Sequence, residues 1–169
     1  MPTADEVVRL LDLKPHPVEG GFFRETWRDA TVIPGASLPR HSEDRPVGTA
    51  IYYLLTGNTV SEMHRLPGDE VFHFYLGDPV RMLQLHPDGS AKVLTLGQDL
   101  LAGQVPQLVV PGGVWQGSHV LPGRHGFALL GATMAPGFDY ADYTTGRRAE
   151  LAKGWPGNDE LLVKLTPKG

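Results

Sequence analysis

Four side chains that can bind a metal or transfer a proton lie in one short stretch, SEMHRLPGDEVFHFYLGDP, at residues 61–79. They are Glu62, His64, Glu70 and His73. Imidazoles and carboxylates are common ligands of divalent metals, and the same groups act as general acids and bases. The stretch therefore predicts a metal site, an acid–base site, or a group of polar residues that are close only in the sequence.

Strand alternation divides these four residues. Both halves of the stretch have strand character, and side chains two positions apart lie on the same face of a strand. Glu62 and His64 are therefore expected on one face. His73 is an odd number of positions from Glu70, so the two should point to opposite faces unless a bulge intervenes.

The elements that must position these residues are short strands between turn sequences. The chain has 21 glycines and 15 prolines, which indicates many turns. A helix is predicted over 3–12, a second helical segment over 147–155, and a mobile loop over 34–47. Strands are predicted at residues 22–29, 49–56, 60–66, 70–77, 80–86, 91–97, 107–111, 114–121 and 125–134. This order favours an all-β sandwich or barrel with short helical ends.

Composition narrows the class of protein. A chain of 169 residues predicts a single domain over 1–169. It has no cysteine, which excludes disulfides, thiol nucleophiles and iron–sulfur clusters. A net charge of -4 argues against a nucleic-acid partner. The sequence has no run of 18 apolar residues and no signal-peptide pattern, so we expect no membrane partner and a cytoplasmic protein.

Two groups of residues resemble the paired motifs of the cupins, a superfamily of small jelly-roll barrels. The first group consists of Gly57, Glu62-x-His64, Glu70 and Gly77. The second consists of Gly103, Pro111-Gly112-Gly113 and Gln116. In the second group, Gln116 takes the place of the usual histidine.

Longer phrases narrow the resemblance to the fifth cupin subfamily, an uncharacterised family of small single-domain cupins. These are EGGFFRET, TAIYYLLTG, MHRLPGDEVFHFYLGDP, LGQDLLAGQVPQLVVPGGVWQG and APGFDYADY, which together extend over about residues 10–155. The resemblance implies an all-β cupin jelly-roll β-barrel with its core at about 45–143. It also implies a homodimer, with the strand at 22–29 reaching the neighbouring subunit.

The resemblance also implies which side chains line the barrel, because the motif glutamate of cupins faces the interior. The expected ligand-binding residues are Glu62, Phe72, Phe74 and Gln116, beside His64 and Glu70. Metal-binding cupins typically use three histidines and a glutamate. If a divalent metal is bound here, its ligands would be His64, Glu70, Glu62 and Gln116, although glutamine is a poor ligand for transition metals.

Three functions are compatible with this pocket. The first is binding of a small polar molecule, sugar-like or nucleotide-sugar-like, with metal-independent epimerase or isomerase activity. His64 would then be the base, Tyr53 the acid, and Glu70 a further catalytic residue. The second is a divalent-metal-dependent dioxygenase or isomerase that uses a depleted cupin site. The third is a non-catalytic dimeric binding or regulatory module.

The other histidines are predicted to have no role in the pocket. His16 and His41 lie in proline-rich loops, and His86 and His125 lie in turns where solvent exposure is expected. His119 is predicted on the outer surface, because it has the opposite strand parity from Gln116.

Overall fold

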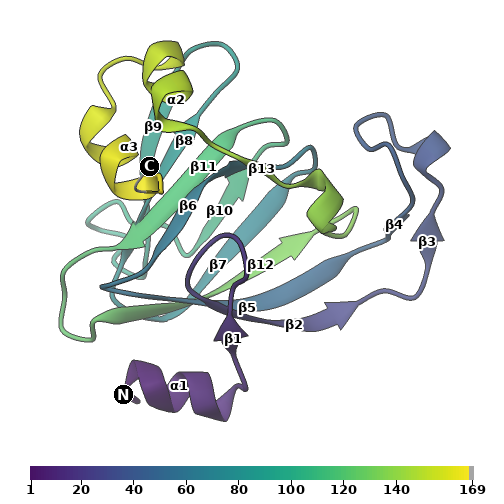
Figure 1. The fold of residues 1–169 in the computed structure, drawn as a ribbon. Coiled ribbons are helices and arrows are strands. Elements are labelled where there is room, and N and C mark those ends of the chain that lie inside the picture. Colours follow the sequence, from purple (N-terminus) through teal and green to yellow (C-terminus); the bar gives the residue numbers. More distant parts are fainter. Residues whose placement is uncertain (168–169) are drawn as a thin grey trace.

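Two antiparallel sheets face each other in the computed structural model, which describes residues 1–167 (Figure 1). The larger sheet has the order β1-β2-β5-β12-β7-β10. Its strands are β1 (Lys14–Pro15), β2 (Phe22–Arg28), β5 (Thr49–Thr56), β12 (Phe127–Met134), β7 (Glu70–Gly77) and β10 (Gln107–Val110). The smaller sheet has the order β13-β6-β11-β8-β9. Its strands are β13 (Thr144–Thr145), β6 (Val60–Arg65), β11 (Trp115–Val120), β8 (Val80–Leu85) and β9 (Ala91–Leu96).

The core lies between the inner faces of the two sheets. Alternate residues of each strand point into it, as the period of two in the sequence predicts. The larger sheet contributes Phe72 and Leu130, both almost fully buried, and the smaller sheet contributes Met82 and Val120. Burial of these apolar side chains is the main stabilising contribution to the sandwich.

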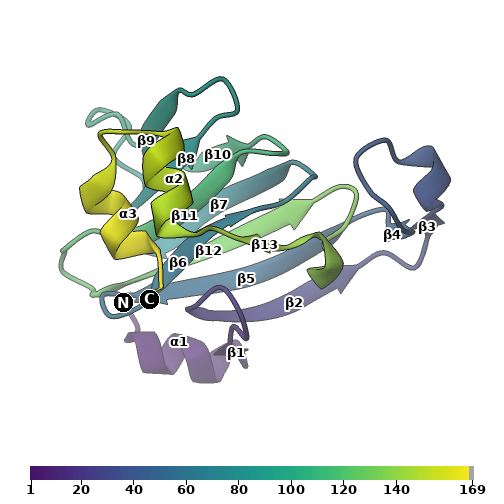
Figure 2. The ribbon, with the colours of Figure 1, turned by 45° about the horizontal axis from the view of Figure 1, so that its top comes forward.

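The outer faces are partly covered by helices (Figure 2). Helices α2 (Arg148–Gly154) and α3 (Asp159–Leu165) pack Leu151 and Leu162 against the outer face of the smaller sheet, where Met63 and Leu83 are buried. Helix α1 (Ala4–Leu10) begins at a capping box formed by Thr3 and Glu6 and packs against the outer face of the larger sheet. In residues 1–167, no helix has the length and apolar character needed to cross a bilayer.

The mainly β prediction is confirmed, and each predicted strand is present with its ends within two residues of the expected position. The predicted helices correspond to α1 and α2, whereas α3 was not predicted. Closure into a barrel is not confirmed, because no described strand belongs to both sheets. The fold is therefore an open two-sheet sandwich across residues 1–167.

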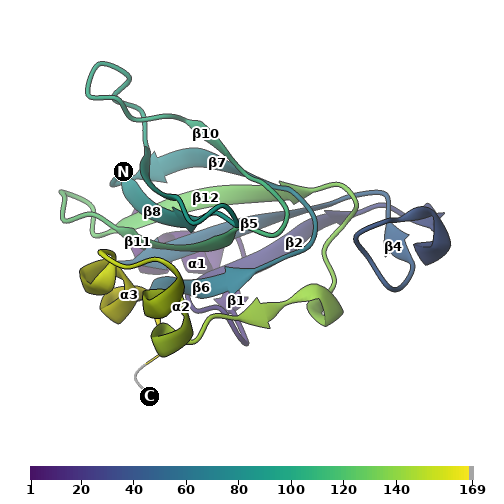
Figure 3. The same cartoon turned by 90° about the horizontal axis from the view of Figure 1, so that it is seen from above.

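The segment at 34–47, predicted as a mobile loop, forms part of an arm that projects from one end of the sandwich (Figure 3). Strand β3 (Val32–Ile33) pairs with β4 (Arg45–Pro46), and a short 3-10 helix, η1 (Gly35–Ser37), lies between them. The arm is anchored by Arg45, whose side chain is 1% exposed and donates to both carboxylate oxygens of Asp142, at 2.8 and 2.6 Å. Where the sequence predicted only a loop, the segment therefore contains a strand, a 3-10 helix and a buried anchor at Arg45.

Candidate functional site

A cavity of about 230 Å³ lies at one end of the sandwich, over the inner face of the larger sheet. Its floor is formed by four neighbouring strands, β2, β5, β12 and β7. Its wall includes the segment at 138–140, which leads into the 3-10 helix η2 (Tyr140–Asp142). The lining residues that carry polar groups are His16, Glu19, Glu25, Arg28, Thr49, Glu70 and Tyr140, and the apolar ones are Phe23, Ile51, Leu66, Ala132, Met134 and Phe138.

Glu19 reaches this cavity from the turn between β1 and β2. The two following residues, Gly20 and Gly21, have φ angles of +97° and +71°, which side chains rarely tolerate. A Cβ at Gly20 would also lie 2.3 Å from the carbonyl oxygen of Val60. The paired glycines let the turn pack directly on β6, and this contact places the Glu19 carboxylate beside the inner face of that strand.

Glu19 is the centre of a polar group contributed by both sheets. The hydroxyl of Ser61 donates to its Oε1 atom. Its Oε2 atom lies 3.8 Å from Nε2 of His64 and 3.9 Å from Nε2 of His16. The side chains of Ser61, His16 and His64 are almost fully buried. The Glu19 carboxylate therefore faces two imidazoles in surroundings that are largely shielded from solvent.

Glu70 is the second carboxylate of the cavity and lies at the start of β7. Its side chain accepts a hydrogen bond of 2.7 Å from the amide nitrogen of Gln116 on the opposite sheet. Burial, followed by the negative charge of Glu19, raises the pKa of Glu70 to about 7, and His64 and Gln116 oppose this rise. Near neutral pH a large share of Glu70 is therefore protonated and able to donate.

A bulge in β6 breaks the alternation that the sequence predicts. Gln116 is paired with His64, but Ser118 is paired with Ser61, so β6 has one extra residue between these pairs. Ser61 and His64 consequently share the inner face, and both contact Glu19. Glu62 was expected on that face beside His64, but the bulge interrupts the alternation between the two residues, and Glu62 does not line the cavity. Glu62 is half-buried, and burial followed by the charge of Glu19 raises its pKa.

His64 is enclosed by aromatic and backbone groups behind Glu19. Its Nδ1 atom lies 2.7 Å from the carbonyl oxygen of Glu62. The ring of Tyr143 stacks on it, with centroids 4.9 Å apart and an interplanar angle of 12°. Burial, followed by the charge of Glu19, raises the pKa of Tyr143, so its hydroxyl remains protonated.

The remaining predicted pocket residues lie deeper in the sandwich. Phe72 and Phe74 pack in the core between the sheets and do not line the cavity. The Tyr53 hydroxyl is buried and donates to the carbonyl oxygen of Gly20 at 2.8 Å. Burial raises the pKa of Tyr53 well above its ordinary value, so it is a weak acid that holds the turn bearing Glu19.

The parity prediction for His73 is confirmed. β7 pairs with β10 without a register shift between Glu70 and His73. The His73 ring lies on the outer face, where its Nε2 atom is 2.9 Å from the hydroxyl oxygen of Thr133. Glu70 points instead to Gln116 across the core.

Two of the histidines expected in loops are packed. His16 lines the cavity and is almost buried, so the expectation that it has no role there is wrong about its position. His41 lies 3.7 Å from Asp142 and is also almost buried. The Nε2 atom of His86 is buried as well, contrary to the exposure expected for a turn. His119 lies on the outer face as expected, but it is buried and its neighbours include Lys164 of α3.

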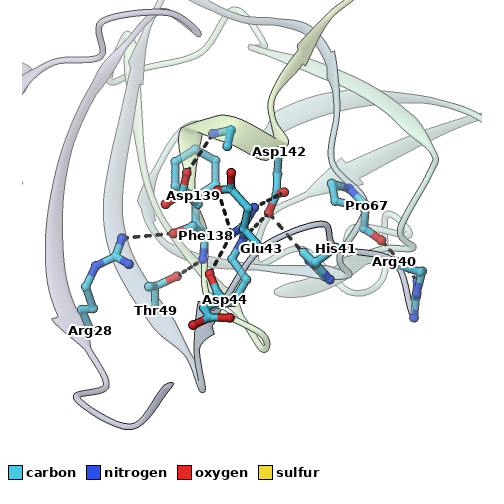
Figure 4. A network of polar contacts seen from close by, with 12 residues as sticks. Arg28, Arg40, His41, Glu43, Asp44, Thr49, Pro67, Phe138, Asp139 and Asp142 are labelled. Atoms are coloured by element: carbon cyan, nitrogen blue, oxygen red, sulfur yellow. Dashed lines mark hydrogen bonds and ion pairs between the residues drawn. The ribbon is translucent and has the colours of Figure 1, made fainter. Parts of the chain in front are cut away.

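The wall of the cavity at 138–140 is held by polar contacts from several elements (Figure 4). The backbone N–H of Phe138 donates to the hydroxyl of Thr49 at 2.9 Å, and its carbonyl accepts from Arg28 at 3.1 Å. Arg28 is in turn held by two hydrogen bonds of 2.9 Å to Glu25. The next anchor along the chain is Asp142, which pairs with Arg45. The aromatic wall therefore depends on β2, β5 and the arm.

The polar residues of the interior do not fit the metal site that the cupin motifs suggest. Glu62 does not line the cavity, and the Gln116 amide uses its nitrogen to donate to Glu70. Across residues 1–167, no group of three or more acidic or histidine side chains is arranged to hold a metal ion. The donor set in this arrangement is suited to hydrogen bonding and proton transfer.

The sequence matches the model of a family described as Cupin superfamily (DUF985) over residues 5–146. The chain belongs to this cupin family. A curated relative in Saccharomyces cerevisiae, Uncharacterized protein YML079W, is 34% identical over an alignment of 136 residues, and the match covers 75% of this cupin and 67% of the yeast protein. The function of the family is not indicated by these matches.

Solved structures are similar to this cupin over the whole chain. A hypothetical protein from Leishmania major is similar to this cupin with a TM-score of 0.88 and 28% identity, covering 99% of this chain and all of that one. Protein SO0799 from Shewanella oneidensis has a TM-score of 0.87 and 32% identity, with full coverage of both chains. Oxalate decarboxylase from Bacillus subtilis is more distant, with a TM-score of 0.55 and 14% identity over 94% of this chain and 38% of that chain. That last likeness shows the fold alone.

Sequence reasoning missed Glu19, His16 and Tyr140 as cavity residues. Glu19 lies in the family phrase EGGFFRET and Tyr140 in APGFDYADY, so the signal was present in phrases that were used only to recognise the family. His16 has no such signal. Its place in the cavity depends on how the chain turns between β1 and β2.

Proposed function

We propose that this cupin is a metal-independent enzyme of the isomerase kind, which binds a small polar molecule in the cavity and moves a proton within it. The observation that carries the proposal is the presence of two carboxylates, Glu19 and Glu70, on one cavity in different environments. A pair of titratable groups with such different surroundings is a common basis for acid and base roles.

The two roles follow from the contacts of each carboxylate. Glu70 is enclosed at the end of the apolar core and has one amide donor, so its neutral form is favoured and it serves as the acid. Glu19 accepts from Ser61 and faces the ring nitrogens of His16 and His64, so it serves as the base. His64, proposed from the sequence as the base, instead acts behind Glu19, because it does not line the cavity.

The size and walls of the cavity support a small, sugar-like ligand. About 230 Å³ is below the ~300–1,000 Å³ that is typical of sites for drug-sized ligands. Phe23, Phe138 and Tyr140 provide aromatic walls on which the C–H faces of such a ligand can pack. Seven of the lining residues carry polar groups, which can fix the orientation of a ligand by hydrogen bonding.

A ligand screen followed by deuterium exchange tests the proposal. Monosaccharides, sugar phosphates and nucleotide sugars are screened by thermal shift, because a ligand that binds only the native state raises Tm. Hits are then incubated with the enzyme in D₂O, and NMR follows the exchange of carbon-bound hydrogen. We expect exchange with wild type and a loss of roughly 100-fold or more in Glu19→Gln and Glu70→Gln, as for removal of a general acid or base.

The alternatives give different results in the same experiment. Binding without any exchange would contradict catalysis and favour the binding or regulatory module. Exchange that disappears on chelation and returns with one divalent metal would favour the metal-dependent dioxygenase or isomerase. A Glu150→Gln variant on the exposed surface of α2 is the matched control and should exchange as wild type does.

We also propose that the chain forms a homodimer. β2 is paired with β1 only at Phe22 and Phe23, so most of its outer edge is free in the described residues. Trp27 on this strand is 46% exposed, which favours a partner for this edge. Light scattering at micromolar concentration should give twice the monomer mass of 18.4 kDa, and a value equal to the monomer mass would contradict the dimer.

A further inference from the structure

The ring of His16 is held in one tautomer by the backbone. Its Nδ1 atom accepts from the backbone N–H groups of Glu19, at 2.9 Å, and Val18, at 3.3 Å. A nitrogen that accepts carries a lone pair, so the proton of the neutral ring is on Nε2. Burial lowers the pKa of His16 and favours this neutral ring, although the charge of Glu19 opposes the effect. His16 therefore presents an N–H donor to the cavity.

His64 is held in the opposite tautomer. Its Nδ1 atom is 2.7 Å from the carbonyl oxygen of Glu62, and a carbonyl can only accept. Nδ1 is therefore protonated, and in the neutral ring the lone pair is on Nε2. The stacked ring of Tyr143 keeps the imidazole in this orientation.

The same oxygen of Glu19 thus lies between a donor and an acceptor. Oε2 is 3.9 Å from the Nε2 donor of His16 and 3.8 Å from the Nε2 lone pair of His64. Both distances exceed that of an N–H···O hydrogen bond, so neither imidazole occupies this oxygen in the described structure. A cavity ligand can therefore approach Oε2 and the His16 N–H together.

From this juxtaposition we infer that the substrate is a small carbonyl compound with a hydrogen on the carbon next to the carbonyl. His16 Nε2–H donates to the carbonyl oxygen, Glu19 Oε2 removes the hydrogen, and His64 Nε2 stores it. This inference rests on the proposed function and deepens it by naming the substrate class. A carboxylate base beside a neutral imidazole donor is an arrangement suited to enolisation.

The proton and electrons balance without a further reactant. The C–H bond breaks, its electron pair forms the carbon–carbon double bond of an enolate, and the carbonyl π electrons move to the oxygen. His16 stabilises that oxygen through its N–H. The proton on Glu19 passes to Nε2 of His64, which becomes an imidazolium and restores the carboxylate. Return of the proton from His64 through Glu19 to the same carbon regenerates the substrate and accounts for exchange with solvent. Protonation of that carbon on its opposite face by Glu70 restores the carbonyl and gives the epimer, after which the imidazolium of His64 loses its proton to solvent and the Glu70 carboxylate regains one.

Ring nitrogen NMR tests the tautomers without any ligand. Nitrogen-15 shifts of the histidine rings distinguish protonated from unprotonated Nδ1 and Nε2, and His16→Asn and His64→Gln assign the signals. At a pH where both rings are neutral, we expect His16 to carry its proton on Nε2 and His64 on Nδ1. The reverse tautomer at either residue would overturn the inference, and it would leave the carboxylate roles of the proposed function unaffected.

A pair of His16 variants tests the donor role with defined probes. Glycolaldehyde, dihydroxyacetone, glyceraldehyde and pyruvate, together with any carbonyl-bearing hit of the screen, are followed for deuterium uptake at the carbon next to the carbonyl. His16→Gln places an amide nitrogen near the position of Nε2, whereas His16→Asn mimics only Nδ1. We expect His16→Asn to lose roughly 100-fold in exchange rate, the cost typical for removing one donor to a developing oxyanion. His16→Gln should restore a measurable part of that loss.

The controls separate failure of this inference from failure of the proposed function. His73→Gln, on the outer face, should exchange at the wild-type rate. Exchange that depends on Glu19 and Glu70 but is unchanged in His16→Asn would overturn the inference alone. The same conclusion follows if exchange is confined to compounds without a carbonyl. Absence of exchange with every probe and every hit overturns both proposals.

Discussion

Replacing Arg45 with methionine should lower the free energy of unfolding by about 3–5 kcal/mol, the range typical for removing one partner of a buried ion pair. The guanidinium is 1% exposed, and its partner Asp142 is 9% exposed. Without Arg45 the Asp142 carboxylate would stay largely buried, with His41 at 3.7 Å as its remaining basic neighbour. Urea unfolding of wild type and variant at neutral pH measures the difference.

A second arginine provides the matched control. Arg40 lies in the same arm and pairs with Asp69 at 3.2 Å, but the two side chains are 57% and 51% exposed. Because solvent screens such a pair, Arg40→Met should cost less than about 1 kcal/mol. The double variant Arg45→Met with Asp142→Asn should recover part of the loss, since it leaves no buried charge. Equal effects of Arg45→Met and Arg40→Met would contradict the anchoring role of Arg45.

Loss of the Arg45–Asp142 ion pair should also change the shape of the cavity. Asp142 closes the 3-10 helix that begins at Tyr140, and both Tyr140 and Phe138 line the cavity. The arm contributes no lining residue of its own. It supports the aromatic wall through the contact of Arg45 with Asp142. The stability of the arm and the shape of the site are linked through one ion pair.

The sequence was sufficient for features that depend on local periodicity. Alternation located the strands, and it placed His73 on the opposite face from Glu70. The inward positions of His64, Glu70 and Gln116 also followed, through the family motifs. The prediction for His73 succeeds because β7 runs without interruption between Glu70 and His73.

The failures concern residues whose positions depend on tertiary contacts. The bulge in β6 depends on how that strand pairs with β11, and it exchanges Ser61 for Glu62 at the inner face. Glu19 meets Ser61, 42 positions away, only because the Gly20–Gly21 turn packs against β6. No spacing rule within one strand connects such residues. The site was therefore predicted from strand residues alone, whereas its central carboxylate comes from the turn between β1 and β2.

Glu70 should control how stability changes with pH. Its pKa is about 7 in the folded chain against an ordinary value of 4.5, so folding favours its neutral form. The stability from this preference is fully present below about pH 4.5 and is lost as the pH rises through about 7. At about 1.4 kcal/mol per pH unit, the rise corresponds to a loss of about 3 kcal/mol between the two limits.

Glu70→Gln removes this titration and keeps an oxygen that can accept from Gln116. Urea unfolding of both proteins at pH 5, 6, 7 and 8 gives the difference in their free energies of unfolding, in which other titrating groups such as His16 largely cancel. Relative to wild type, the variant should become more stable by about 2–3 kcal/mol as the pH rises from 5 to 8. Glu150→Gln, at an exposed site on α2, should show no such trend. A constant difference between Glu70→Gln and wild type would mean that Glu70 does not titrate in this range. In that case it could not alternate between donor and acceptor near neutral pH, and the acid in the proposed reaction would have to be another group on the cavity.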